Sequence, residues 1–293
     1  MTTLFSELVA MLTDPLMQRS LLAALVVGLT APVIGTYLVQ RRLSLLGDGI
    51  GHVALTGVGV GLLFNQSPVL TAVVVAAIGA VGVELVRERG RTSGDLALAL
   101  LFYGGIAGGV VLVGLSDDSG SANLVQYLFG SLTTTSGSDL VVIAVLGAAV
   151  LAAMLLLRPA LFAVCDDEEY ARVSGLPVRA LNLLMAVTTA VTVTIAMRTV
   201  GLLLVSALMV VPVAAAQQIT RGFSATMAVA MSVGLVAALS GVLVSAEIDT
   251  APGATVVILA LALFLVLTGV GAAIGRRQVP PQRAEPPDVV LHG

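Results

Sequence analysis

Residues 43–64, LSLLGDGIGHVALTGVGVGLLF, form an apolar run that contains one carboxylate, Asp48, and one imidazole, His52. About 20 residues of α-helix cross the hydrocarbon core of a bilayer, so the run is long enough to span a membrane. The spacing of four residues places Asp48 and His52 one above the other on the same helix face. The stretch therefore predicts a membrane-spanning helix that carries two polar side chains in its interior.

Similar apolar runs occupy most of the chain. Of its 293 residues, 58% are hydrophobic and 11% are charged, and the mean hydropathy is +1.07. Because soluble domains average about 25% charged residues, we expect an all-α polytopic membrane protein. The runs predict about nine helices, and a count of eight is the alternative because 199–219 follows its predecessor so closely. The predicted helices are 18–40, 43–64, 68–86, 95–115, 139–157, 179–197, 199–219, 225–245 and 253–275.

These helices predict one transmembrane domain over residues 18–275. Residues 1–17 are expected to lie at the membrane interface as an amphipathic lead-in. The tail 276–293 is proline-rich and polar, which predicts disorder. The start of the chain contains Glu7 and Asp14 and no positively charged region, so it is not expected to be a signal peptide.

The arginines predict how the helices are oriented. All fourteen basic residues are arginine. If Arg41 and Arg42 lie in the cytoplasm and the helices alternate, twelve arginines fall on the cytoplasmic side and only Arg19 and Arg198 fall outside. This topology places the N-terminus outside and the C-terminus in the cytoplasm of a multi-pass protein of the plasma membrane, the inner membrane of the cell.

The absence of lysine also limits the chemistry. A Walker A loop needs its lysine against the nucleotide phosphates, so the chain is expected to have no nucleotide site and no enzymatic activity of its own. The one cysteine, Cys165, cannot form an internal disulfide, and we interpret it as an ordinary thiol.

Two connections are too long to be simple turns. Residues 121–138, SANLVQYLFGSLTTTSGS, fall on the outer side and predict a re-entrant or interfacial segment. Residues 158–178 fall on the cytoplasmic side, and DDEEYARVSG within them predicts a short helix, with acids in its first turn and glycine at its end. Such a helix is either a loop that happens to be helical or a docking element for a cytoplasmic partner.

Asp48 and His52 offer the donors that divalent first-row metal ions bind, a carboxylate oxygen and a neutral imidazole nitrogen. A helix start near Leu43 places His52 roughly 13 Å deep in the membrane, with Asp48 about one turn nearer the cytoplasm. An acid within the membrane normally faces a cavity or a partner. Two donors are too few for a tight site, which suits transient binding; candidates for further ligands are Thr188, Thr192 and Ser206. The alternative is that the two side chains hydrogen-bond to each other and only hold a helix contact.

Five segments, taken in order, resemble the permease subunit of the zinc/manganese ABC importers. The resemblance covers nearly the whole chain, residues 15–275. The segments are RRLSLLGDGIGHVALTGVGVG at 41–61, GDLALALLFYGGIAGGVVLVG at 94–114, QYLFGSLTTTSGSDL at 126–140, EEYARVSGLPV at 168–178 and TVGLLLVSALMVVPVAAAQ at 199–217.

This resemblance implies a fold of the type II, vitamin B12 importer class, with two permeases, two cytoplasmic ATPases and an external metal-binding protein; the two permeases form either a homodimer or a heterodimer. The family's Gly-Asp-x-x-x-His signature, implicated in metal passage, matches Gly47, Asp48 and His52. Gly51 and Thr56 stand where the family commonly has serine and proline. The family's coupling loop matches Asp167, Glu168, Glu169, Tyr170, Ala171, Arg172, Gly175, Leu176 and Pro177.

The expected function is therefore ATP-driven import of Zn²⁺ or Mn²⁺, with no permanently bound cofactor and no nucleic-acid partner. One imidazole and one carboxylate serve either metal, so the sequence does not choose between them. One alternative is a permease of the same fold for a siderophore or cobalamin, in which Asp48 and His52 are structural. Another is a proton-coupled secondary carrier, against which the docking segment 165–178 argues.

Acidic residues also gather in the connections expected on the outer side. They are Asp117, Asp118, Glu247 and Asp249. Because an imported ion arrives from that side, we expect these residues to form a rim that receives the metal-binding protein. The alternative is that they are ordinary solvated loop charges.

Overall fold

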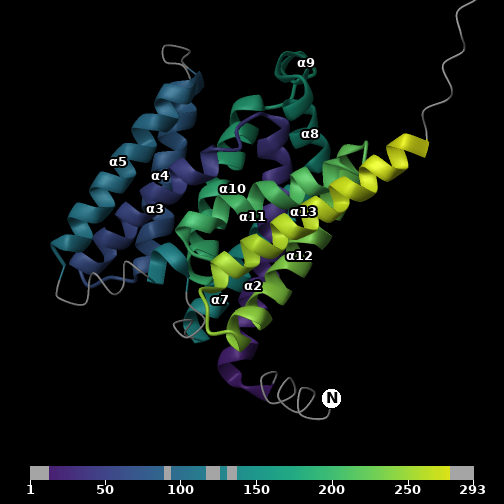
Figure 1. Cartoon of the computed structure of the whole chain (residues 1–293). Helices are drawn as coiled ribbons and strands as arrows, with labels where there is room; N and C mark the ends of the chain where they lie inside the picture. Colours follow the sequence, from purple (N-terminus) through teal and green to yellow (C-terminus); the bar gives the residue numbers. More distant parts are fainter. Residues whose placement is uncertain (1–12, 89–93, 117–125, 131–136, 278–293) are drawn as a thin grey trace, which may run out of the picture.

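The computed structural model describes residues 13–88, 94–116, 126–130 and 137–277, and the regular structure in these ranges is helical (Figure 1). The helices are α2 (Pro15–Gln40), α3 (Leu46–Leu63), α4 (Pro68–Glu88), α5 (Gly94–Gly114), α7 (Gly137–Leu156), α8 (Arg158–Asp166), α9 (Glu168–Val173), α10 (Val178–Thr199), α11 (Leu202–Gln217), α12 (Phe223–Glu247) and α13 (Pro252–Arg277). The predicted lead-in 1–17, tail 276–293 and outer segment 121–138 lie largely outside the described ranges; α2 begins at Pro15, and residues 126–129 form a helical turn.

Eight of these helices are long and apolar enough to cross a membrane. The exception among the predicted spans is α11, whose 16 residues give a length of about 24 Å. It nevertheless runs alongside α13. Gly253 of α13 packs against the backbone of Val200, just before α11, and Gly271 of α13 packs against that of Gln218, just after α11. The prediction of an all-α polytopic membrane protein is confirmed, with eight full-length spans in the described residues and a shorter ninth helix beside them.

A glycine separates α10 from α11. Gly201 has φ 88°, a left-handed conformation that side chains rarely adopt. A Cβ at this position would also overlap the backbone of Phe129 and Gly130. The chain therefore reverses here without a connecting loop, which explains why the two predicted helices follow each other so closely.

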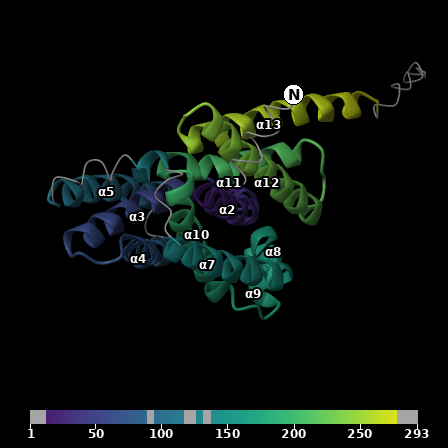
Figure 2. The ribbon, with the colours of Figure 1, turned by 90° about the horizontal axis from the view of Figure 1, so that it is seen from below.

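Helix α2 occupies the centre of the bundle and packs against α7, α10, α11 and α12 (Figure 2). Asp14 caps its first turn by accepting a hydrogen bond from the Leu16 amide at 3.1 Å. Pro32 lies within the helix, where Gly234 of α12 leaves room for its ring. Small residues at this contact let the two backbones approach closely, as is usual between helices in lipid.

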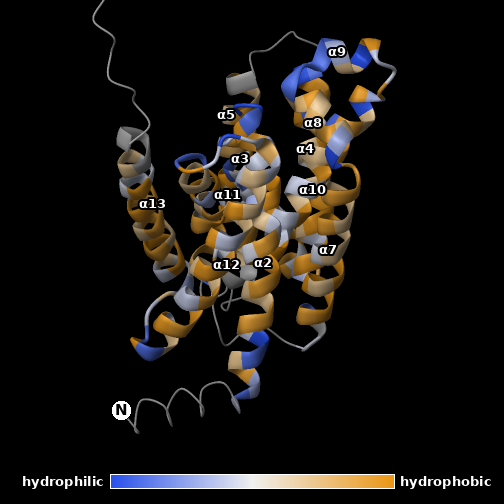
Figure 3. Ribbon diagram, turned by 90° about the vertical axis from the view of Figure 1, so that its right-hand side faces the viewer, coloured by the Kyte–Doolittle hydropathy of each residue, from blue (hydrophilic) through white to orange (hydrophobic). Residues whose placement is uncertain are grey.

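Helices α3, α4 and α5 form a group at one side of the bundle, joined to the rest mainly through contacts of α10 with α3 and α4 (Figures 1 and 2). Helices α4, α5, α7 and α13 carry exposed apolar side chains along most of their length. Figure 3 shows that α7 and α13 consist mostly of hydrophobic residues. Outward apolar surface of this kind suits a lipid environment.

The bundle has two distinct ends. Helices α8 and α9 lie at the end where α2 finishes, because Arg41 reaches Glu168 of α9. The other end contains the start of α2, where Met17 packs with Val242 near the end of α12. The N-terminal end of α2 and helix α9 therefore lie at opposite ends of the molecule (Figure 3).

Candidate functional site

A tight turn sets the start of α3 and so the position of Asp48. Arg42 has φ 59°, and the Leu43 amide donates a hydrogen bond to the Leu38 carbonyl at 2.8 Å. These residues are therefore part of a turn, and α3 begins at Leu46 rather than near Leu43 as predicted. Measured along the helix axis from Leu46, Asp48 then lies about 3 Å and His52 about 9 Å into the helix. The predicted start near Leu43 places His52 about 13 Å into it.

Asp48 lies beside a cavity of about 260 Å³ between α3 and α5. The residues that line the cavity are Leu45, Asp48, Gly49, Leu98, Ala99, Phe102 and Tyr103. Asp48 is half-buried in the first helical turn, where a negative charge is favoured by the helix dipole. The cavity wall is otherwise apolar apart from the Tyr103 hydroxyl, so the carboxylate is the charged group that faces this space.

His52 lies one turn farther along the same face and is buried, with 8% of its surface exposed. The edge of its ring meets Phe102 of α5, with centroids 4.4 Å apart and the ring planes at 75°. Its Nδ1 atom is buried and has no hydrogen-bond partner. Leaving a buried polar atom without a partner costs about 1–3 kcal/mol of folding free energy. Such atoms are rare in folded proteins, and this one makes the His52 ring a candidate for binding a ligand.

Helix α5 approaches the backbone of His52 through Gly105. A Cβ on Gly105 would lie 2.6 Å from the His52 carbonyl carbon and 2.8 Å from its oxygen. The Thr56 hydroxyl donates to the Gly105 carbonyl at 2.8 Å and fixes the register of the two helices. Phe102 and Gly105 were not among the predicted site residues, although the segment LFYGGIAGG that contains them stood out in the sequence.

The other candidate donors have different surroundings. The Thr188 hydroxyl donates to the Leu184 carbonyl at 2.7 Å, so it is satisfied within α10. The Thr192 hydroxyl is fully buried and has no partner. Ser206 and Met209 of α11 lie beside Gly47, next to Asp48 in the chain, and the Met209 sulfur was not predicted. Among the described residues no group of three or more His, Cys, Asp or Glu side chains could hold a metal ion.

The predicted short helix after α7 is present as α9. Asp167 caps it by accepting a hydrogen bond from the Tyr170 amide at 2.9 Å, and Gly175, with φ 83°, ends the turn that follows it. Ala171 is fully buried, whereas Tyr170 and Val173 are 68% and 88% exposed. Tyrosine is enriched in protein–protein interfaces, so the exposed Tyr170 is compatible with the predicted docking role of this helix.

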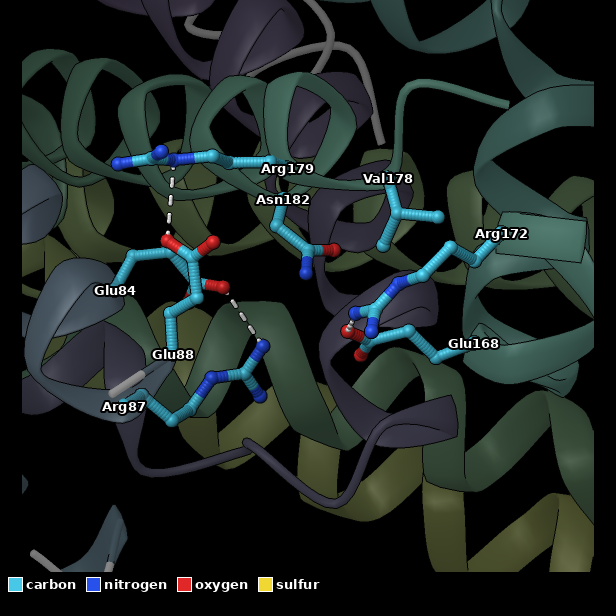
Figure 4. A pocket seen from close by; sticks show the side chains of 8 residues that line it. All are labelled: Glu84, Arg87, Glu88, Glu168, Arg172, Val178, Arg179 and Asn182. Atoms are coloured by element: carbon cyan, nitrogen blue, oxygen red, sulfur yellow. Dashed lines mark hydrogen bonds and ion pairs between the residues drawn. The ribbon is translucent and has the colours of Figure 1, made fainter. Parts of the chain in front are cut away.

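Charged side chains from α4, α9 and α10 surround a pocket of about 280 Å³ beside α9 (Figure 4). Arg87 pairs with Glu84 at 2.8 Å, Arg179 with Glu88 at 3.1 Å and Arg172 with Glu168 at 3.3 Å. The second oxygen of Glu168 pairs with Arg41 at 2.8 Å. Burial, with Arg87 nearby, lowers the pKa of the Arg41 guanidinium, and Glu168 opposes this effect.

The remaining coupling and rim residues are on the surface or outside the described ranges. Glu169 and Pro177 are exposed, and the Leu176 amide donates to the Ala171 carbonyl at 3.1 Å. Glu247 and Asp249 are exposed where α12 joins α13, at the end of the bundle opposite α9. Asp117 and Asp118 lie outside the described residues. The half-buried Cys165 has its Sγ 3.9 Å from the Met185 sulfur, and burial raises its pKa to about 11, which agrees with an unreactive thiol.

Membrane-spanning helices around a half-buried carboxylate at a pocket, with a buried imidazole one turn away, are typical of one class of protein, the polytopic permeases. Comparison with known families places this permease: the model of the ABC 3 transport family matches residues 13–270, and the chain belongs to that family. It is a membrane permease of ABC metal transport, as the sequence predicted.

Curated relatives carry the names of several metals. The chain is 31% identical to the manganese transport system membrane protein MntC of Halalkalibacterium halodurans, over 85% of each chain. It is 32% identical to the chelated iron transport system membrane protein YfeD of Yersinia pestis, over 91% of this chain and 89% of the relative. It is 28% identical to the high-affinity zinc uptake system membrane protein ZnuB of Haemophilus influenzae, over 84% of this chain and 94% of the relative.

A solved structure has the same fold. PsaBC from Streptococcus pneumoniae, determined in complex with a Fab, matches with a TM-score of 0.80 and 27% identity, over 90% of this chain and 95% of that one. The fold prediction, a type II ABC permease, is therefore confirmed.

Proposed function

We propose that this permease conducts Zn²⁺ or Mn²⁺ across the membrane and that the ion binds transiently to Asp48 and His52. The observation that supports this most strongly is the pairing of a half-buried carboxylate at a cavity with a buried imidazole nitrogen that has no partner one turn away. A bare divalent ion cannot enter hydrocarbon, so its path must replace part of the hydration shell with protein donors. Asp48 supplies negative charge, and His52 supplies a nitrogen lone pair.

The size of the cavity favours an ion over a chelate. Pockets for drug-sized ligands occupy about 300–1,000 Å³. The space beside Asp48, at about 260 Å³, lies below this range, whereas the six waters of a hydrated ion need roughly 180 Å³ at about 30 Å³ each. The unpaired Nδ1 of His52 supports the same choice, because a chelated metal has its coordination positions filled and would not need the nitrogen.

The remaining parts of the proposal concern partners and orientation. A separate cytoplasmic ATPase docks on the coupling segment 158–178 through α9 and drives alternating access, and the permease itself hydrolyses no ATP. A second permease copy completes the membrane part, and an external metal-binding protein delivers the ion to the opposite end of the bundle. With α9 in the cytoplasm, the N-terminus lies outside and the C-terminus inside.

The test is uptake of Zn, Mn and Fe by cells that express the permease with its ATPase and binding protein. Asp48→Asn keeps the shape of the side chain and removes its charge, and His52→Leu keeps bulk and removes the ligand. Both variants should abolish uptake per folded permease in the membrane. Asp14→Asn is the matched control, because asparagine caps a helix as well as aspartate does and Asp14 lies at the far end of α2.

A structural pair would behave differently, since its loss would lower the amount of folded protein and leave the uptake of each remaining molecule near normal. That result would exclude Asp48 and His52 from the path. Because the Yersinia pestis relative is named as a chelated iron transport protein, transport of chelated iron is the second candidate function. It predicts uptake of iron only with a chelator present and indifference to His52→Leu.

A further inference from the structure

The side chain of Arg41 joins three helices at the end of the bundle where α9 lies. Its Nη2 pairs with Glu168 Oε2 of α9 at 2.8 Å, and its Nη1 donates to Asn182 Oδ1 of α10 at 2.7 Å. Arg41 itself is the C-cap of α2 and directly follows its last residue, Gln40. Only 8% of the Arg41 side chain is exposed, so its charge is shielded from solvent, whereas 39% of the Glu168 side chain is accessible.

Arg41 is also close in the chain to the proposed ion path. Its amide donates to the Tyr37 carbonyl at 3.1 Å, and the Leu43 amide donates to Leu38 at 2.8 Å, so the turn after α2 is fixed by backbone hydrogen bonds. This turn leads directly into α3, and Asp48 follows Arg41 by seven residues. A displacement of Arg41 therefore reaches the first turn of α3 through a short and well-ordered connection.

The other charged groups around the pocket do not make this connection. Arg172 pairs with Glu168 within α9, at a side chain that is 69% exposed. Arg87 and Glu84 pair within α4, and Arg179 with Glu88 joins α10 to α4 (Figure 4). The pair Arg41–Glu168 is the one of these four that ties α9 to the helix preceding the ion path.

We propose that Arg41 is a positioning residue that transmits movement of α9 to the start of α3 and thereby moves Asp48 relative to its cavity. The proposal rests on the proposed function, in which α9 is the docking helix of the ATPase. When the ATPase displaces α9, Glu168 carries Arg41 with it. The pair stays together during this movement, because separating it would leave the buried Arg41 guanidinium without a compensating charge.

The test uses the permease with its ATPase in proteoliposomes and measures ions transported per ATP hydrolysed. Arg41→Gln keeps a donor for Asn182 and loses the ion pair, and Glu168→Gln removes the charge from the other side. Each should leave the ATPase bound and active and should lower the transport ratio roughly tenfold, within the usual range of coupling between sites. The double variant should be no worse than either single one, because both remove the same contact.

Glu88→Gln is the matched control. It removes an ion pair beside the same pocket, with Arg179 at 3.1 Å, but this pair joins α4 to α10 and does not involve α9, so the transport ratio should stay at the wild-type value. An unchanged ratio in Arg41→Gln and Glu168→Gln, or additive losses in the double variant, would overturn the proposal. Loss of the bound ATPase in Arg41→Gln would also overturn it, since Arg41 would then support docking rather than transmission. If Ala171→Pro, which breaks α9, leaves the ATPase bound, the docking role of α9 is wrong instead.

Discussion

Replacing Gly105 by alanine should loosen the contact between α5 and α3 at His52. The added Cβ would lie 2.6 Å from both the His52 carbonyl carbon and the Val53 nitrogen, and backbone atoms cannot rotate away as a side chain can. Overpacking of this kind costs about 1–3 kcal/mol, against a gain of about 1 kcal/mol from replacing glycine in a helix. We expect a net loss of stability of up to about 2 kcal/mol, together with a shift of Phe102 away from the imidazole.

The neighbouring residue provides the control. Gly104 is exposed on the same helix, and a Cβ there would meet no atom within 4 Å. Gly104→Ala should therefore stabilise the helix by up to about 1 kcal/mol and leave transport unchanged. The two variants differ by about 1–3 kcal/mol, measurable as a difference of several degrees in the thermal midpoint of the purified permease in detergent.

Uptake of metal per folded permease should fall in Gly105→Ala, because the cavity beside Asp48 is walled by α5. Equal thermal midpoints and equal uptake in Gly104→Ala and Gly105→Ala would refute this reasoning, because the close approach of α5 to His52 would then affect neither stability nor transport.

Three further predictions concern the ends of the molecule. Ala171→Pro removes the amide that donates to the Asp167 carbonyl at 3.0 Å and should release the ATPase in a pull-down assay, whereas retention would refute the docking role of α9. Reversing Glu247 and Asp249 to lysine should weaken binding of the external protein more at low salt than at high salt, and unchanged affinity at low salt would mean that these charges are not part of the rim. The pKa of Cys165 is raised from 9.0 to about 11, so a smaller fraction of the thiol is ionised at pH 8. Maleimide should therefore label Cys165 roughly a hundredfold more slowly than an unperturbed thiol. A labelling rate equal to that of a free thiol would contradict this.

The membrane-spanning helices could be predicted because hydrophobic length is a local property of the chain. The start of α3 could not be placed as well. Leu43 and Leu45 are apolar and extend the run, but the left-handed backbone of Arg42 keeps them in a turn. Hydropathy does not report backbone conformation, so the predicted helix begins three residues early.

The site could be predicted only where its residues are neighbours in sequence. Asp48 and His52 share one helix face, and their spacing of four residues reveals this. The contacts of His52 with Phe102 and Gly105 join residues some fifty positions apart, and the pair of Arg41 with Glu168 spans 127. These contacts depend on how whole helices pack, which no local pattern of residue types specifies.

The central position of α2 has a consequence for how the protein is made. It is the first of the described spans to leave the ribosome, yet much of its surface is covered by helices at the other end of the chain, such as α12. At about 5–20 residues per second, the roughly 180 residues between the end of α2 and the start of α12 take about 10–40 s to synthesise. During this interval α2 lacks α12, one of its final neighbours, and its buried hydroxyl groups include those of Ser20, Thr30 and Thr36. The hydroxyl groups bridge the delay by bonding within the helix, Thr30 to the Val26 carbonyl and Thr36 to the Pro32 carbonyl, so the nascent helix exposes few unsatisfied groups to lipid while it waits.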